Sequence, residues 1–176
     1  IIPNAVGVDI GCGVCAVRSS IDEWDEQRLK SALALIRSRI PLGFEHHRQP
    51  QSRDLMPDQR SGTVCGREYT NALTQLGTLG GGNHFIELQK DAEHHLWVMV
   101  HSGSRNVGKQ VAEHYNRAAG AFTRSHDRNV PPQWELDYLP ADSEEGSNYI
   151  DEMNWCVGFA FANRQLMVSR IEEVLS

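Results

Sequence analysis

The run from Leu96 to Val100 restricts the fold of this chain more than any other feature. It is almost wholly apolar, and the polar His101 follows it directly. Strands with apolar residues on both sides are typical of sheets that are covered on both faces. We therefore expect a central strand of a sheet buried on both faces, with a loop at its end.

Other segments predict further strands. Ala5–Ile10 and Val14–Val17 are rich in β-branched and apolar residues and flank a Gly-Cys-Gly break, so we expect two short strands around a tight turn. Phe85–Leu88 follows a glycine-rich loop and predicts one more strand.

Apolar residues at helical spacing predict three helices. The first covers residues 22–40, with Asp22 and Glu23 in its first turn. A short one around Tyr69 and Leu73 ends at Gly77, and the last starts at an N-cap, Asn148, and continues nearly to the end of the chain. The expected fold class is α/β (α+β), a mixed central sheet flanked by helices with the functional site at strand ends.

Length and composition indicate one globular domain. The chain has 176 residues, 40% hydrophobic residues and a net charge of -6, which argues against coating nucleic acid through bulk charge. No window approaches the roughly 18 apolar residues of a membrane span, and no signal peptide is recognisable. We expect a soluble, cytoplasmic protein without membrane contact, and the absence of an initiator Met suggests a fragment.

The cysteines are expected to be reduced thiols, because four of them in 176 residues without a secretory signal do not indicate a disulfide framework. Cys12 and Cys15 form a C-x-x-C spacing, but a strand-like segment follows them where a redox motif would open a helix. No second pair is present to complete a zinc site.

The segment from Asp9 to Cys12 is the first candidate for chemistry. In an extended strand the two side chains would point to opposite faces, but glycines at 11 and 13 allow the backbone to turn and bring them together. A carboxylate and a thiolate side by side are costly to bury unless a cation neutralises them. Taken alone, the motif is equally compatible with a capping Asp and an inert Cys.

Two histidines stand where glycine-rich loops meet apolar runs. His84 follows three glycines and Asn83, a backbone suited to phosphate, and His101 opens the loop that ends at Arg105, whose guanidinium suits bidentate phosphate contact. Together with Asp9 and Cys12, they suggest a metal centre beside a bound nucleotide or phosphoester.

The paired histidines are interpreted differently. His46-His47 and His94-His95 lie in polar stretches, and adjacent side chains on an extended backbone diverge, so we expect surface residues. The basic residues between His101 and Arg128, and the seven acids between Glu135 and Glu152, suggest one basic face and one acidic segment, although two ordinary solvated faces are an equal alternative.

Several of these segments resemble the successive signatures of the RtcB family of RNA ligases. They are Gly7–Gly13 (GVDIGCG), Leu79–Glu87 (LGGGNHFIE), His101–Arg105 (HSGSR) and Tyr138–Gly146 (YLPADSEEG). The resemblance covers most of the chain. It implies an RtcB-like fold, with residues 1–176 forming a single domain that represents the metal- and GTP-binding half of the enzyme.

The resemblance implies a GTP- and manganese-dependent enzyme of tRNA splicing and RNA repair. Such an enzyme joins an RNA 3′-phosphate or 2′,3′-cyclic phosphate end to a 5′-hydroxyl end. Its partners would be RNA, either tRNA halves or broken ends, GTP and an activating protein that the sequence does not identify. Manganese accepts carboxylate and imidazole, a thiolate can bridge two ions, and two cations can neutralise the phosphates during nucleotidyl transfer.

Matched residue by residue, the resemblance also assigns roles. The ligands of two Mn²⁺ ions would be Asp9, Cys12, His84 and His101. The GTP site would be lined by Asn83, His84, Phe85, Ile86 and Glu87. The residues expected to act in catalysis are Cys12, as the bridging thiolate, and Arg105, as a contact of the RNA terminal phosphate.

The departures from the family pattern lie elsewhere. The histidine that becomes guanylylated, a further metal-binding histidine and GTP-holding basic residues belong to a C-terminal part absent after Ser176, so we expect this chain alone not to complete ligation. The stretch between Cys12 and His84 is shorter than usual, which suggests missing residues around His47–Arg53. Alternatives are a metal-dependent phosphoesterase or nucleotide hydrolase, and a truncated RNA- or nucleotide-binding module.

Overall fold

A computed structural model describes residues 1–21, 25–59, 63–127 and 129–176. The helices and strands confirm an α+β fold. The strands are β1 (Gly13–Arg18), β2 (Phe85–Lys90) and β3 (Leu96–Ser102). The helices are α1 (Glu26–Arg39), α2 (Val64–Gln75), α3 (Arg105–His126) and α4 (Glu144–Leu175), with 3₁₀ turns η1 (Pro3–Ala5), η2 (Arg53–Leu55) and η3 (Pro132–Trp134).

The strands form one sheet in the order β1-β3-β2, so the predicted central position of β3 is confirmed. Both pairings are antiparallel, and the expectation of a mixed sheet is therefore wrong. The reason is the short connection between β2 and β3, since strands joined by a tight hairpin must run in opposite directions. A parallel bridge joins Leu42 to Gly80 outside the named strands.

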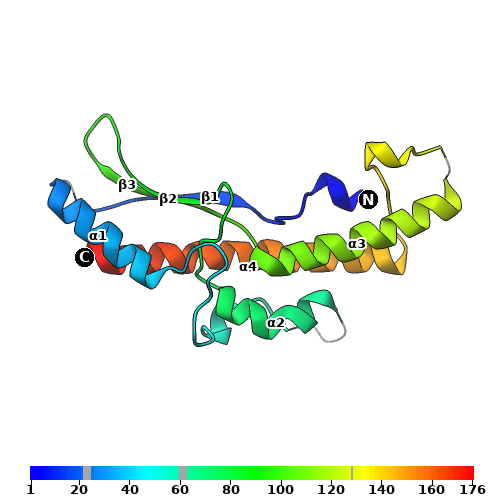
Figure 1. The fold of residues 1–176 in the computed structure, drawn as a ribbon, viewed down its shortest axis with the longest axis horizontal. Coiled ribbons are helices and arrows are strands. Elements are labelled where there is room, and N and C mark those ends of the chain that lie inside the picture. Colours follow the sequence, from blue (N-terminus) through cyan, green and yellow to red (C-terminus); the bar gives the residue numbers. More distant parts are fainter. Residues whose placement is uncertain (22–24, 60–62, 128) are drawn as a thin grey trace.

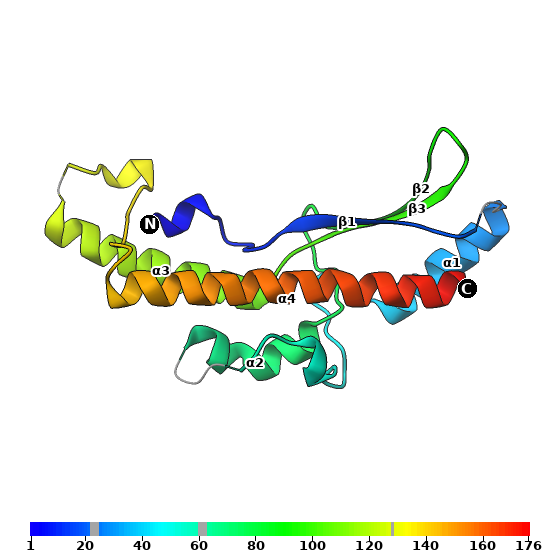
Figure 2. The same ribbon diagram turned by 180° about the vertical axis from the view of Figure 1, so that it is seen from behind.

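Among the described residues, helices cover only one face of the sheet (Figures 1 and 2), so the expectation of burial on both faces is also wrong. Along β3, Val98 and Val100 are buried whereas Trp97, Met99 and His101 are partly exposed. Figures 1 and 2 show α4 running along the molecule, with the sheet on one side of it and α2 on the other. The partly exposed residues of β3 thus lie on an open face.

The segment Ala5–Ile10 is not a strand. The chain leaves the turn η1 and reaches Gly7 with a φ of 84°, a left-handed conformation that interrupts an extended backbone. Val8 is 54% exposed and Ile10 fully buried, so the apolar residues do not line one face of a sheet. This segment is a loop anchored by Ile10.

The helix starts depend on capping residues. Asp25 caps α1 by accepting the Arg28 N–H at 2.7 Å. The predicted first-turn acids Asp22 and Glu23 lie outside the described residues. The predicted cap Asn148 is wrong for α4. Ser143 takes that position and accepts the Gly146 N–H at 3.0 Å.

Helix α4 divides the core into two clusters of buried residues. One lies between its C-terminal half, α1 and the covered face of the sheet, and includes Ile36, Val98, Val100, Met167 and Ile171. The other lies between its N-terminal half, α2 and α3, and includes Leu73, Val111, Tyr149, Trp155 and Phe159. In the described ranges, no helix combines the length and apolarity needed to cross a membrane.

Candidate metal centre

The loop before β1 presents Asp9 and Cys12 to the same side. The Cys12 N–H donates to the Asp9 carbonyl oxygen at 3.1 Å, and Gly11 adopts a φ of 75° within this turn. A Cβ on Gly11 would lie 2.9 Å from the Cα of Val157 in α4, so no larger residue fits. The turn is therefore held against α4, and the expected approach of Cys12 to Asp9 is what the structure shows.

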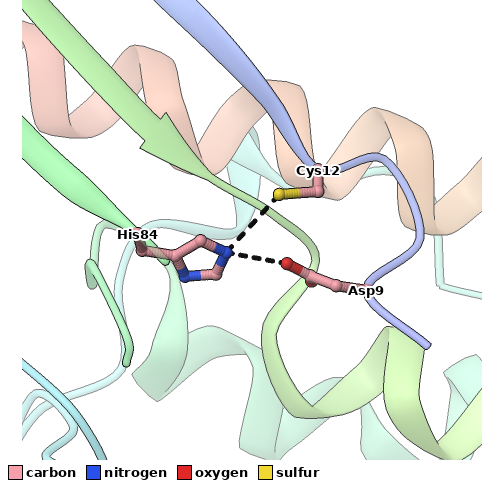
Figure 3. Close-up of side chains that lie close together, drawn as sticks. All are labelled: Asp9, Cys12 and His84. Atoms are coloured by element: carbon pink, nitrogen blue, oxygen red, sulfur yellow. Dashed lines mark hydrogen bonds and ion pairs between the residues drawn. The ribbon is translucent and has the colours of Figure 1, made fainter. Parts of the chain in front are cut away.

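One histidine just before β2 and one on β3 come close to Asp9 and Cys12. His84 precedes β2, and His101 lies on β3 in register with Phe85. The His84 Nε2 is 2.8 Å from Asp9 Oδ2 and 3.5 Å from Cys12 Sγ, as Figure 3 shows, and the His101 Nε2 is 3.0 Å from Cys12 Sγ. The side-chain ligand atoms of Asp9, Cys12 and His84 all lie within 4.8 Å of one another.

The protonation of His84 follows from its second ring nitrogen. Its Nδ1 is 3.0 Å from the Leu79 carbonyl oxygen, which can only accept, and 3.5 Å from Arg105 Nη1, which can only donate. Because the contact with Leu79 is the shorter, we assign a proton to Nδ1. In the neutral ring the Nε2 then presents a lone pair to the Asp9 carboxylate, and two acceptors at this distance repel each other unless a proton or a cation lies between them. Metal-binding histidines commonly have this arrangement.

The thiol of Cys12 needs a cation to ionise at neutral pH. Burial, followed by the hydrogen bond and negative charge of Asp9, raises the pKa of Cys12 to about 11, and the charge of Arg164 lowers it only in part. A bound cation reverses this preference, since a coordinating thiol is deprotonated. Without such a cation, the surroundings of Cys12 therefore favour the neutral thiol over the thiolate.

Helix α3 begins beside the Asp9 carboxylate. Gly103 precedes this helix, and a Cβ placed on it would lie 2.3 Å from Asp9 Oδ1, so the carboxylate occupies the space of a side chain. The next residue, Ser104, is buried and its hydroxyl has no hydrogen-bond partner among the described residues. Close packing of the helix start therefore fixes the position of Asp9.

Arg105 lies beside His84 and crosses over Gly80. Its Nε donates to Thr78 Oγ1 at 3.3 Å and its Nη2 to the Gly43 carbonyl oxygen at 3.4 Å. A Cβ on Gly80 would lie 1.9 Å from the Arg105 Nη1, so this glycine makes room for the guanidinium. Burial lowers the pKa of Arg105, but a guanidinium keeps its charge in proteins.

The residues expected to line a GTP site are divided between two faces of the sheet. Phe85 packs edge-on against His101, with ring centroids 5.3 Å apart, and Glu87 is exposed on the same open face. Asn83 is exposed next to His84. The structure does not bring the Ile86 side chain to this group, because it packs on the covered face against the buried cluster of the sheet.

Two polar residues of α4 hold the site together and were missed in the sequence. Arg164 Nη1 donates to the carbonyl oxygens of Gly11 and Ser102, both at 2.8 Å, and so joins the Cys12 turn to the end of β3. Asn163 is fully buried and accepts from the Gly77 N–H at 2.7 Å. The feature of the sequence that could have identified Asn163 was its position at helical spacing among the buried apolar residues of α4.

The paired histidines differ from one another. His47 is not a surface residue, because its Nε2 lies 3.2 Å from the Gly77 carbonyl oxygen and 2.8 Å from Arg170 Nη1, and burial together with that arginine lowers its pKa. His95 is partly buried and contacts Asp91 at 3.1 Å, whereas His46 and His94 are exposed as predicted. Arg128 lies outside the described residues.

A comparison with known families identifies the chain. The sequence profile described as tRNA-splicing ligase RtcB matches residues 45–176. The chain belongs to the RtcB family. It is 30% identical to the RNA-splicing ligase RtcB of Escherichia coli, over 99% of this chain and 47% of that protein.

A second relative agrees. The chain is 31% identical to the tRNA-splicing ligase RtcB of Thermococcus kodakarensis, over 98% of this chain and 45% of that protein. It thus spans less than half the length of these relatives. The alignments extend over 196 and 222 positions, more than the 176 residues present, so the relatives contain internal segments that this chain lacks.

Proposed function

We propose that this chain is the metal- and guanylate-binding half of a GTP-dependent RNA ligase, within a single domain formed by residues 1–176. The enzyme would join an RNA 3′-phosphate or 2′,3′-cyclic phosphate end to a 5′-hydroxyl end. The observation that carries the proposal is the convergence of Asp9, Cys12, His84 and His101 from three separate segments on one point. The matched relatives are named as RNA-splicing ligases, which supports the same reaction class.

The donor set fits divalent manganese. Asp9, Cys12 and His84 would hold one ion, and the contact of Cys12 with His101 would let the thiolate share a second. Carboxylate and imidazole suit Mn²⁺, and the thiolate would lie between the two charges. When bound, the ions supply positive charge that stabilises phosphate oxygens during transfer of the guanylate.

The remaining residues would orient the nucleotide and the RNA. Phe85 offers an aromatic ring, and Glu87 a carboxylate that can accept hydrogen bonds from a guanine base, on the open face beside His101. Asn83 offers an amide next to His84, and Ile86 would contribute through its main chain. Arg105 would contact the terminal phosphate of the RNA. The histidine that accepts GMP would belong to the rest of the enzyme.

Incubation with labelled GTP and Mn²⁺ tests the proposal. We expect the intact gene product to acquire a covalent GMP adduct, and the chain of 176 residues to bind GTP in a Mn²⁺-dependent way without an adduct. An intact product that binds GTP and forms no adduct would contradict a ligase. Release of phosphate from GTP by the chain alone would favour a nucleotide hydrolase instead.

A further inference from the structure

A cleft of about 480 Å³ opens beside the metal centre. Its lining includes Asp9 and His84 of the metal centre, together with Phe44, Arg105 and Lys109. This volume falls in the range of about 300–1,000 Å³ that is usual for small-molecule sites. The role proposed above for the metal centre does not account for Phe44 or Lys109.

Phe44 is held in place although its side chain is fully solvent-exposed, at 101%. The Gly43 N–H donates to the Gly80 carbonyl oxygen at 2.8 Å, the Glu45 N–H donates to the Leu42 carbonyl oxygen at 3.0 Å, and Arg105 donates to the Gly43 carbonyl oxygen. Backbone hydrogen bonds thus hold the loop at the residue before Phe44 and at the residue after it. The ring projects from a fixed backbone into water.

The cleft has more cationic than anionic side chains among its described lining residues. Among its described lining residues, the carboxylate is Asp9, at the metal centre. Arg105 and Lys109 are one helical turn apart on α3, and Lys109 is exposed with its Nζ 3.7 Å from Glu113 Oε1, a contact that leaves it accessible to another anion. Two cations and an exposed aromatic ring therefore line the same cleft as the metal centre.

We propose that this cleft holds the terminal nucleotides of a single-stranded RNA, with a base stacked on Phe44 and the adjoining phosphodiester on Lys109. Cationic grooves with projecting aromatic rings bind single strands in this way, whatever the base. The inference rests on the proposed function, which places the terminal phosphate at Arg105. It adds a positioning role for Phe44 and Lys109, by which the chain would direct the RNA end toward Asp9 and His84.

Binding of a short RNA with a 3′-phosphate and a terminal 2-aminopurine tests the proposal on the whole chain. We expect Phe44→Ala to weaken binding by about 5-fold or more and to abolish quenching of the base, and Phe44→Trp to restore both. Phe161→Ala is the matched control, because Phe161 is also exposed, at 56%, but lies on α4. Lys109→Gln should reduce the salt dependence of log K by about 0.7.

Two further experiments test whether the base that stacks on Phe44 belongs to the RNA or to GTP. An RNA with an abasic terminal residue should bind the wild-type chain as weakly as the intact RNA binds the Phe44→Ala chain. The affinity of Phe44→Ala for GTP should equal that of the wild type, and a loss of GTP affinity would overturn the assignment to RNA. Equal RNA affinity and quenching in Phe44→Ala and wild type would overturn the proposal while leaving the ligase function intact. A wild-type chain that binds neither GTP with Mn²⁺ nor RNA would overturn both.

Discussion

At the scale of single residues, several proposed ligands are positioned by neighbours that do not themselves face the metal centre. His84 is oriented by the Leu79 carbonyl oxygen, and the turn at Cys12 is held by Arg164. The sequence predicted the ligand types and their convergence, because each of them borders a glycine turn. It did not predict Arg164, since a long side chain on a helix gives no sign of which carbonyl groups it reaches.

Gly103 is the neighbour that most closely limits Asp9. We expect Gly103→Ala to lower Mn²⁺ affinity by about 10-fold or more, because the new Cβ would displace the carboxylate. Titration calorimetry measures the change, and circular dichroism shows whether the variant folds. Gly81→Ala is the control, since its Cβ would meet its nearest atom, the Gly43 Cα, at an ordinary 3.7 Å. Equal losses in both variants would contradict this role of Gly103.

The raised pKa of Cys12 predicts how metal binding depends on pH. Because Mn²⁺ competes with a proton for a thiol whose pKa is about 11, affinity should increase as pH rises, by up to about 10-fold per unit between pH 7 and 8.5. Calorimetry in buffers of different ionisation enthalpy counts the protons released. Cys12→Ser should bind Mn²⁺ more weakly and release fewer protons, and equal proton release by both proteins would exclude a thiolate ligand.

At the scale of elements, the places where prediction failed share a cause. The cap at Ser143 and the cap expected at Asn148 satisfy the same local preference, and contacts outside the helix choose between them. A Cβ on Gly146 would lie 2.0 Å from the Pro140 carbonyl oxygen, a contact with the preceding loop that sequence periodicity does not reveal. Ala5–Ile10 has strand-like composition, but no neighbouring strand pairs with it in the described sheet.

The β2–β3 hairpin depends on Asp91. This carboxylate accepts from Trp97 Nε1 at 2.8 Å and from the backbone N–H groups of Glu93 and His95. The hydrogen bond from Trp97, followed by the hydrogen bonds and charge of His95, lowers the pKa of Asp91 from 3.8 to about 2. Its stabilising effect is therefore complete above pH 4 and is lost as pH falls toward 2.

We expect Asp91→Ala to lower the midpoint of thermal unfolding at pH 7 and to make it less sensitive to pH between 4 and 2. Thermal melts over this range check the prediction. Glu93→Ala is the matched control, because the Glu93 side chain is 78% exposed in the same turn. Identical pH profiles for wild type and Asp91→Ala would contradict a role for this carboxylate in the hairpin.

At the scale of the whole molecule, α4 connects the parts of the site. Its Asn163 donates to the Gly103 carbonyl oxygen and accepts from the N–H groups of Gly77 and Thr78, so one buried amide joins the start of α3 to the loop before His84. The sequence predicted this helix from apolar residues at helical spacing, but two of them, Val157 and Phe161, are 44% and 56% exposed, so the buried stripe coincides only in part with the predicted one. The central role of the polar Asn163 within the buried stripe could be seen only in the folded arrangement, in which its amide meets backbone groups up to 86 positions away.

The open face of the sheet is another feature that depends on distant segments of the chain. The sequence predicted burial on both faces from the apolar residues of β3, whereas this chain covers one face and leaves Trp97, Met99 and His101 partly exposed on the other. The relatives are more than twice as long as the aligned part. Periodicity within one strand reports how apolar its faces are, but it does not report which segment covers them.

The stoichiometry of Mn²⁺ binding tests the central claim most directly. Calorimetric titration of the chain of 176 residues should show two ions for the wild type, one for His101→Ala, and at least about 10-fold weaker binding for Cys12→Ala, whereas Cys15→Ala, on the covered face of β1, should match the wild type. Unchanged stoichiometry and affinity in the His101 and Cys12 variants would contradict a two-ion centre that shares the Cys12 thiolate.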